Sequence, residues 1–395
     1  MKSFPNPGAS MLCREEAEAA AEVLYAQSPF RYYGPNLLGR VKQFEQEFAA
    51  KIGAAHALGV TSGTAALVCA LKACGIGPGD KVIVPACTFI ATPGAAICAG
   101  TVPVFCDIDE SLNMDPAAIE KAADKYTRAV IPVPILGAPC RMDEIMAVAK
   151  RLGLMVIEDV AQSMGSTYQG QACGTFGDLG TFSIQLHKMI TAGEGGLVVS
   201  NDAALYERAV RYHDQGLLRE SEGLPVGEAF VGQNYRMNEI TGAVALAQLQ
   251  KLDGIVASLR KVKKLIKDEL RGIVPLRRVD DEAGDAANTF MMLFPDVPTR
   301  EKFEAALKAR GIPCGCLYGG RPVYLQPQIL HQRTAERGNF PFNQFDEPVI
   351  YTEDMCPRTI EIMPRNLIIQ LSPLMTEADA AEIVGACKKA AREVL

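Results

Sequence analysis

Short, nearly all-apolar runs alternate with amphipathic stretches along the first half of the chain. Each run has the length of a strand, and an apolar residue at almost every position is typical of strands buried on both faces. This alternation predicts an α/β fold, with a parallel or mostly parallel sheet covered by helices on both sides. The predicted strands are Val82–Pro85, Val102–Ile108, Ala129–Val133, Met155–Asp159, Thr181–Ile184 and Leu197–Ser200, and the helices between them are Thr92–Ala99, Pro116–Lys125 and Asp143–Leu152.

The pattern changes in the last third of the chain, where the composition shifts near Val274. We predict a large domain of residues 1–254 and a smaller α+β domain of residues 255–395. They share an interface, because no low-complexity linker separates them. The remaining predicted helices are Glu15–Gln27, Val41–Ile52, a helix from Ser62-Gly63-Thr64 to near Gly75, Ala203–His213, Glu239–Leu270, Thr299–Arg310 and Glu377–Val394, and the remaining strands are a run from Ala57 to the turn at Ser62, Thr289–Phe294 and Leu367–Leu371.

The overall charge excludes some classes of function. The 395 residues carry a formal net charge of −6, and no basic stripe stands out, which argues against binding to nucleic acid.

The uncharged stretch from Val82 to Phe105 has the length of a membrane span. Pro85, Pro93 and Gly94 interrupt it, so we interpret it as strand, helix and strand and predict no membrane contact.

The twelve cysteines are scattered through apolar segments, and no C-x-x-C pair occurs. We expect reduced core thiols, no metal site and a cytoplasmic location. The residues after Met1 contain no apolar core region, so no signal peptide is predicted.

Lys188 lies between two predicted strands and precedes a glycine cluster, Gly193-Glu194-Gly195-Gly196. Surface lysines normally occupy polar helix faces or loop tips. A lysine amine is nucleophilic only when neutral, and desolvation or a nearby positive group lowers its pKa far enough for a Schiff base. Taken alone, Lys188 fits a catalytic amine or a structural ion-pair partner equally well.

Other polar groups fall at the same edge of the predicted sheet, the carboxyl ends of the strands, where ligands bind in such folds. The turn Ser62-Gly63-Thr64 opens a helix and offers free N–H groups to a phosphate, although simple N-capping explains the same pattern. Its spacing matches neither a Walker A motif nor a dinucleotide fingerprint. Asp159 ends a buried strand, so it either caps a helix or faces a protonated ring nitrogen.

These groups together predict a site for pyridoxal 5′-phosphate (PLP). This cofactor needs a lysine for its aldehyde, an acid at its ring nitrogen, an aromatic face and a phosphate cup. Lys188, Asp159, Phe89 and the Gly63-Thr64 turn supply one each. The pairing of Asp159 with Lys188 favours the catalytic role of the lysine.

A set of short motifs runs over most of the chain and is densest between Ala57 and Gly242. By these motifs the sequence resembles the DegT/DnrJ/StrS family of PLP-dependent sugar aminotransferases; no single motif is specific, but the set is. The motifs are Thr61-Ser62-Gly63-Thr64-Ala65-Ala66, Gly77-Pro78-Gly79-Asp80, Pro85-Ala86-Cys87-Thr88-Phe89, Glu158-Asp159-Val160-Ala161-Gln162-Ser163, Lys188 with Gly193-Glu194-Gly195-Gly196, and Asn234-Tyr235-Arg236-Met237.

The resemblance implies a type I, aspartate aminotransferase-like PLP fold and a homodimer whose active sites are built from both subunits. Lys188 would carry the cofactor and Asp159 would face its ring nitrogen. Gln162 would face the phenolic oxygen, and Phe89 would stack on the ring. The implied phosphate contacts are Gly63, Thr64, Ser183 and Asn234 of the partner subunit.

Two positions depart from the family's pattern. Ile184 stands where an aromatic residue is usual, and His187 directly precedes the lysine. One branch of the family replaces the lysine with histidine and is a PLP-dependent sugar 3-dehydratase. Lys188 keeps the aminotransferase alignment counted back from Gly193, which favours the aminotransferase. The dehydratase is the alternative prediction. A non-catalytic PLP-binding regulator is a second one, although no DNA-binding helix pair is attached.

The predicted reaction is a ping-pong transamination from glutamate or glutamine to a keto-sugar. Lys188 would move the proton, and Asp159 would keep the ring nitrogen protonated. A nucleotide sugar, an oxidised 3-deoxy-octulosonate and a cyclitol all stay open as the acceptor. The candidate substrate contacts are Arg31, Tyr32, Tyr33, His187, His331 and Arg333.

Overall fold

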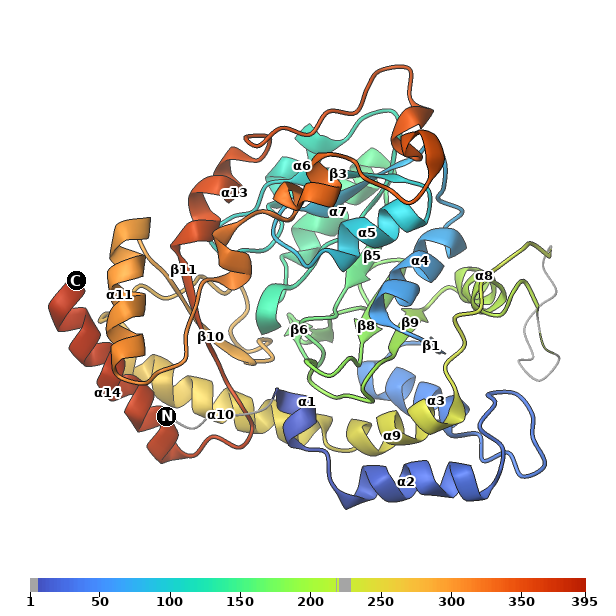
Figure 1. The fold of residues 1–395 in the computed structure, drawn as a ribbon, viewed down its shortest axis with the longest axis horizontal. Helices are drawn as coiled ribbons and strands as arrows, with labels where there is room; N and C mark the ends of the chain where they lie inside the picture. Colours follow the sequence, from blue (N-terminus) through green and yellow to red (C-terminus); the bar gives the residue numbers. More distant parts are fainter. Residues whose placement is uncertain (1–5, 218, 220–228) are drawn as a thin grey trace.

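The computed structural model describes residues 6–217, residue 219 and residues 229–395, and this part of the chain folds around a seven-stranded sheet (Figure 1). The strand order is β1-β9-β8-β5-β4-β2-β3. β9 runs antiparallel to both of its neighbours, and the other pairs are parallel, so the predicted mostly parallel α/β sheet is confirmed. The strands are β1 (His56–Val60), β2 (Lys81–Pro85), β3 (Val102–Cys106), β4 (Thr127–Val130), β5 (Met155–Asp159), β8 (Leu179–Ser183) and β9 (Gly196–Ser200).

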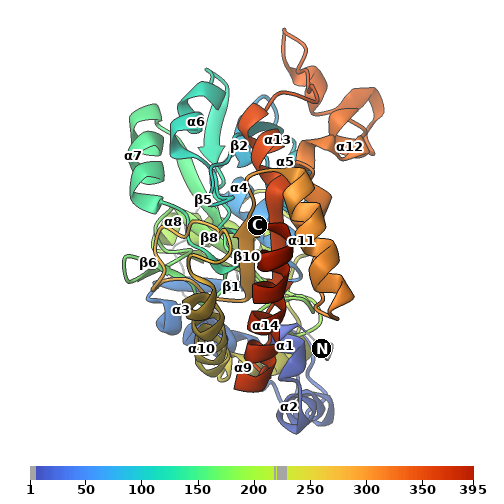
Figure 2. The ribbon, with the colours of Figure 1, turned by 90° about the vertical axis from the view of Figure 1, so that its left-hand side faces the viewer.

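Helices cover both faces of the sheet, which is why its strands are apolar throughout. Val82 and Val84 of β2 pack into the cluster formed with α4, whereas Ile83 between them packs toward α6 and α7. Figure 2 shows α6 and α7 together on one side of the strands. The helices around the sheet are α4 (Gly63–Ala73), α5 (Ala91–Cys98), α6 (Pro116–Ala122), α7 (Met142–Leu152) and α8 (Ala203–His213).

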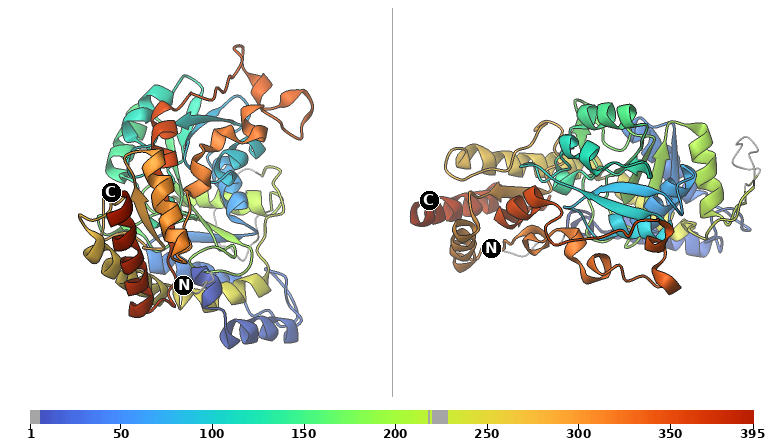
Figure 3. Two further views of the ribbon diagram at one scale, coloured as in Figure 1. Left: turned by 60° about the vertical axis from the view of Figure 1, so that its left-hand side comes forward. Right: turned by 90° about the horizontal axis from the view of Figure 1, so that it is seen from above.

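The N-terminal helices pack against α9 (Glu239–Leu249), and the C-terminal elements pack against α10 (Leu252–Leu270). Strands β10 (Thr289–Leu293) and β11 (Asn366–Gln370) form an antiparallel pair. Seen from above in Figure 3, α14 lies at one end of the molecule and α8 at the other. The other helices are α1 (Pro7–Ser10), α2 (Arg14–Tyr25), α3 (Arg40–Ile52), α11 (Val297–Ala309), α12 (Pro327–Leu330), α13 (Pro357–Ile362) and α14 (Glu377–Val394), and a two-stranded ribbon joins β6 (Thr167–Tyr168) to β7 (Gln171–Ala172).

The long helix predicted over Glu239–Leu270 is two helices, because the chain bends at Gln250 and Lys251 between α9 and α10. One apolar cluster runs from Phe44 and Phe182 through Leu259 to Phe290 and Ile383, so the sheet and the C-terminal elements share a core. The predicted division between residues 254 and 255 falls in the first turn of α10, and it stays a prediction.

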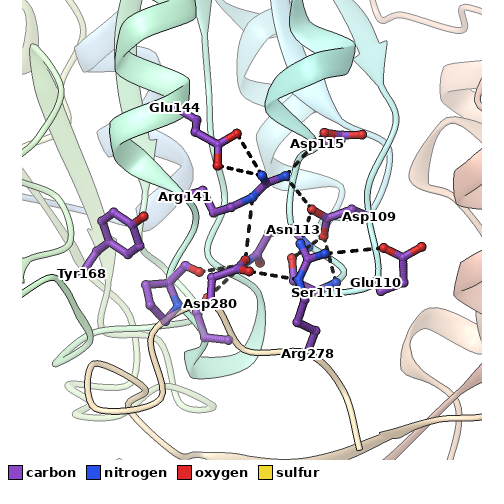
Figure 4. A network of polar contacts seen from close by, with 12 residues as sticks. Asp109, Glu110, Ser111, Asn113, Asp115, Arg141, Glu144, Tyr168, Arg278 and Asp280 are labelled. Carbon is purple, nitrogen blue, oxygen red and sulfur yellow. Dashed lines mark hydrogen bonds and ion pairs between the residues drawn. The ribbon is translucent and has the colours of Figure 1, made fainter.

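A charge network joins the loop after β3 to the segment before β10 (Figure 4). Arg141 donates to Asp109 at 2.8 Å, and Arg278 donates to the same carboxylate. Arg278 also pairs with Asp280 at 2.9 Å. Asp109 is buried, so this network ties segments that are distant in the sequence to one anchored carboxylate.

None of the helices in the described part of the chain combines the length and the apolarity that a membrane crossing requires.

Candidate active site

A cavity of about 710 Å³ lies at the carboxyl ends of β5 and β8 and at the start of α4. Most of the cofactor contacts predicted from the sequence line it. It is also lined by the turns around Leu136 and Tyr318, both of which have left-handed backbone conformations, with φ of 47° and 52°. Such strained residues persist where the surrounding structure fixes them, often at active sites. The lining residues among the predicted contacts are Gly63, Thr64, Phe89, Asp159, Gln162, Ser183, His187 and Lys188.

Lys188 lies in the loop between β8 and β9, and its side chain faces the cavity. Hydrogen bonds close the loop on itself: the N–H of Leu186 donates to the carbonyl of Gly193, and that of Ala192 donates to the carbonyl of Ile184. Burial lowers the pKa of Lys188, against the attraction of Asp159 and Glu194. The fold therefore makes the neutral, nucleophilic amine easier to reach than it is in water.

Asp159 ends β5 on the strand next to β8, and its side chain is almost fully buried. Its carboxylate accepts hydrogen bonds from the hydroxyl of Thr92 at 2.8 Å and from the N–H of Ala161 at 3.2 Å. Burial raises the pKa of Asp159, although both hydrogen bonds and the charge of Lys188 oppose the shift. A buried carboxylate of this kind gains most from a cationic partner, such as a protonated ring nitrogen.

The start of α4 meets the end of β8 in a close contact. Ser62 caps the helix by accepting the N–H of Ala65 at 3.0 Å. A Cβ added to Gly63 would lie 2.8 Å from the Cβ of Ser183, so only glycine permits this approach. Because the first N–H groups of a helix have no intrahelical partner, this corner suits a phosphate.

Two buried amide oxygens face the cavity without a partner within the described residues. They are Oε1 of Gln162 and Oδ1 of Asn288. The Asn288 side chain also donates to the carbonyl of Gln162 at 3.0 Å, which fixes the two side by side. Tyr318 lies beside them, and burial raises the pKa of its phenol against a hydrogen bond with Gln162.

The cavity therefore fits PLP. Lys188 can carry the aldehyde, Asp159 can face the ring nitrogen, and the Gly63 corner can hold the phosphate. The unpartnered oxygen of Gln162 suits the phenolic hydroxyl. Phe89, 55% exposed, lines the wall and offers an aromatic face.

Several predicted substrate contacts lie outside this chain's own cavity. Arg31 is buried and pairs with Glu45 at 2.7 Å. The hydroxyl of Tyr32 hydrogen-bonds to Nε2 of His213 at 3.1 Å, and Tyr33 is exposed. His331 and Arg333 are exposed beyond α12. Their roles stay predictions.

Asn234 is also exposed outside the cavity, on a bridge to Asp214. The family resemblance implies that it acts in the neighbouring subunit's site. A residue that cannot reach its own cavity is compatible with that assignment, which stays a prediction.

Other polar residues of the cavity are not among the predicted cofactor and substrate contacts. Ser62 and Glu194 lie in motifs named above, whereas Asn6, Gln185, Asn288, Tyr318 and Gln370 do not. Asn288 precedes a predicted strand but comes from the C-terminal third, and Asn6 belongs to a polar N-terminus. Neither has a motif around it. The Leu-Tyr-Gly-Gly turn at Tyr318 was the one available signal, since paired glycines mark a backbone of unusual conformation.

The sequence profile of the DegT/DnrJ/EryC1/StrS aminotransferase family matches residues 13–388. One relative, a GDP-perosamine synthase of Caulobacter vibrioides, is 41% identical over 75% of this chain and 80% of its own. The L-glutamine:2-deoxy-scyllo-inosose aminotransferase of Streptomyces lividus is 34% identical over 74% of this chain and 70% of its own. The solved structure of S. venezuelae DesV, in complex with a ketimine intermediate, superposes with a TM-score of 0.82 at 30% identity, covering 95% of this chain and 94% of DesV.

Proposed function

Because this chain belongs to the DegT/DnrJ/EryC1/StrS aminotransferase family and uses PLP as its cofactor, we propose that it transfers an amino group from glutamate or glutamine to a keto-sugar. The proposed kinetic scheme is ping-pong, with the donor and the acceptor using one cavity in turn. Both half-reactions then need the same base and the same anion.

One observation carries this proposal: the carboxylate of Asp159, at the end of β5, and the amine of Lys188, in the loop after the neighbouring strand β8, face a single cavity. The amine has a lowered pKa, and the carboxylate is buried with two hydrogen bonds that orient it. A base and a fixed anion in one partly closed site are what an amino transfer requires.

When bound, PLP supplies an aldehyde that takes up amino groups and a ring that accepts electrons from a breaking C–H bond. Nζ of Lys188 holds the cofactor, and when freed and neutral it takes the α-proton of the donor and later delivers a proton to the acceptor. Asp159 keeps a proton at the ring nitrogen. Thr92 holds the carboxylate of Asp159 in place from α5.

We favour a nucleotide-linked keto-sugar as the acceptor. The relative that is 41% identical is named GDP-perosamine synthase, and GDP is a nucleotide. Within the described lining of the cavity, Lys188 is the one lysine or arginine, so a diphosphate needs cations from elsewhere. The cyclitol named in the Streptomyces lividus relative and an oxidised 3-deoxy-octulosonate are the other acceptors to be tested.

A second copy of the chain would supply such cations in a homodimer with shared sites. Arg219 lies 4.6 Å from the ring centre of Tyr32 and pairs with Asp214 at 2.8 Å. Arg236 pairs with the same buried carboxylate. This cluster is partly exposed and lies next to Asn234 in the sequence, so one interface would bring all of these groups to the neighbouring site.

A half-reaction screen tests the function. The PLP-loaded enzyme is mixed with glutamate, glutamine and a panel of other amino acids, and loss of visible absorbance identifies the donor. Candidate keto-sugars are then added, and recovery of the absorbance identifies the acceptor. Recovery with a nucleotide-linked keto-sugar supports the proposal, and no response to any donor overturns it.

The same screen separates the alternative sugar 3-dehydratase. In that reaction the donor still leaves as its keto acid, but its nitrogen is released as ammonia and is not placed on the sugar, so ammonia is measured alongside the absorbance. We expect none, because Lys188 is present and its charge acts on Asp159. As the location we propose the cytoplasm, where the twelve free thiols would stay reduced.

A further inference from the structure

The N-terminal segment contacts the Lys188 loop. The N–H of Gly8 in α1 donates to the carbonyl of Lys188 itself, at 3.0 Å. Next to this bond, Nδ2 of Asn6 donates to Nδ1 of His187 at 2.6 Å, and both side chains line the cavity. Two neighbouring residues of the catalytic loop are thus held by a segment about 180 residues earlier in the chain.

Gly8 is the residue that allows this contact. A Cβ added there would lie 2.8 Å from Cα and C of Ile190 and from N of Thr191. All three are backbone atoms, which cannot move aside as a flexible side chain can. The preceding Pro7 suits the first position of the short helix, so the local sequence presents the Gly8 N–H to the loop.

The segment is itself anchored on the other side. Nζ of Lys251, at the bend between α9 and α10, donates to the carbonyl of Met11 at 3.1 Å and pairs with Glu16 at 2.6 Å. Figure 1 shows α1 beside this bend. Although burial opposes it, hydrogen bonds from Lys251, Gln248 and the N–H of Cys13 lower the pKa of Glu16 to about 2. Glu16 is therefore ionised at neutral pH, where it can pair with Lys251.

Gln248 connects Glu16 of this anchor to the Lys188 loop. Its Nε2 donates to Glu16 at 2.8 Å, and its Oε1 accepts the N–H of Thr191 at 3.2 Å. Gln248 is fully buried. The Lys188 loop is thus held at two points by one polar circuit, through Gly8 at Lys188 and through Gln248 at Thr191.

We propose that Asn6 and Gly8 are positioning residues of the active site, which fix the Lys188 loop so that its amine stays aligned with Asp159 and the bound cofactor. This inference rests on the proposed function only where its test measures the rate of the donor half-reaction. Bending of the loop by even 1 Å is enough to slow a reaction about 100-fold, because the reacting groups must start from a near-attack geometry.

The test compares Gly8→Ala and Asn6→Ala with Gly385→Ala, whose added Cβ in α14 meets nothing within 4 Å. Each full-length variant is loaded with PLP, and two properties that need no sugar substrate are measured. These are the pH midpoint of the visible absorbance, which reports the environment of the Lys188 link, and the Kd of PLP. The thermal midpoint is recorded as the measure of overall folding.

For Gly8→Ala we expect a shifted pH midpoint and a fall of about 10- to 100-fold in the rate of the donor half-reaction. Asn6→Ala loses one exposed hydrogen bond, so we expect a smaller change in the same direction, about two- to tenfold. Gly385→Ala should match the wild type in all readouts. If Gly8→Ala does not fold, the measurements on Asn6→Ala alone test the proposal.

The inference is overturned if folded Gly8→Ala and Asn6→Ala both keep the wild-type pH midpoint and the wild-type Kd for PLP. Failure of the proposed function looks different, since the wild type would then respond to no donor while these spectral differences persisted.

Discussion

Asp159 and Lys188 reach one cavity from adjacent parallel strands, and each charge acts on the pKa of the other. Asp159 ends β5, whereas Lys188 lies beyond the end of β8 in a loop. Their attraction opposes the effect of burial on both groups. The pair therefore combines an amine that deprotonates more readily than usual with an anion held by Thr92 and Ala161.

Replacing Asp159 with Asn should preserve PLP binding and lower the turnover rate about 100- to 1,000-fold. The amide keeps the shape of the side chain but removes the anion, and a preorganised charge at a reacting centre contributes on that order. Steady-state kinetics measure the loss, and equilibrium dialysis measures retained PLP. Asp253→Asn, on an exposed carboxylate that pairs with Lys51, is the matched control and should leave both values unchanged. A fully active Asp159→Asn enzyme would contradict the assignment of this residue.

The same substitution should stabilise the cofactor-free protein at neutral pH. The folded pKa of Asp159 is above its ordinary value of 3.8, so the folded state binds the proton more tightly than the unfolded state. Stability then falls as pH rises from 3.8 through the folded pKa, and the full penalty is present above it. Thermal melts over a pH series that starts near 3.8 and ends at 8 should show the gain for Asp159→Asn growing until the pH passes the folded pKa and staying constant above it. A gain that is the same over the whole series would mean that the ionised carboxylate carries no burial penalty.

Gly63→Ala should weaken PLP binding by displacing Ser183. The new Cβ would lie 2.8 Å from the Cβ of Ser183, and overpacking of this kind typically costs about 1–3 kcal/mol, or roughly 5- to 150-fold in affinity. Titration of the apoenzyme with PLP gives the Kd. Gly254→Ala, with open space around its added Cβ, serves as the control. Unchanged affinity in Gly63→Ala would place the phosphate elsewhere.

The sequence predicted the parts of the site that belong to the sheet. Asp159 follows a buried apolar run, and Lys188 follows another, and parallel strands bring their carboxyl ends to one edge. The glycines near Lys188 and the Ser62-Gly63-Thr64 turn have local signatures as well. These features could be predicted because strand periodicity and turn chemistry are local properties.

The sequence did not predict the contacts that depend on tertiary packing. Asn288 and Tyr318 reach the cavity only because the C-terminal elements pack against the part of the chain that forms the sheet. The apolar cluster that includes Phe290 joins the two parts. Gly8 carries no pattern that links it to Lys188. The bend between α9 and α10 was also missed, since apolar residues continue with helical periodicity across it.

Mixing two inactive variants tests whether the sites are shared between subunits. Lys188→Ala removes the catalytic amine, and Asn234→Ala removes a residue that is predicted to act in the partner's site. A mixed dimer has one site with both residues intact, so co-expression should restore up to about half of the wild-type activity per mixed dimer. Mixing Lys188→Ala with a second copy of itself is the control and should stay inactive. No recovery in a confirmed mixed dimer would show that Asn234 serves its own chain.

The attachment of the cofactor is the most direct test of the account. The PLP-loaded enzyme is reduced with sodium borohydride, digested and mapped by mass spectrometry, which locates the lysine that carries the cofactor. We predict the label on Lys188 alone and its complete loss in Lys188→Ala, with Lys251→Ala still labelled. Label on any other lysine of the wild-type enzyme, or none after loading with PLP, would contradict the account.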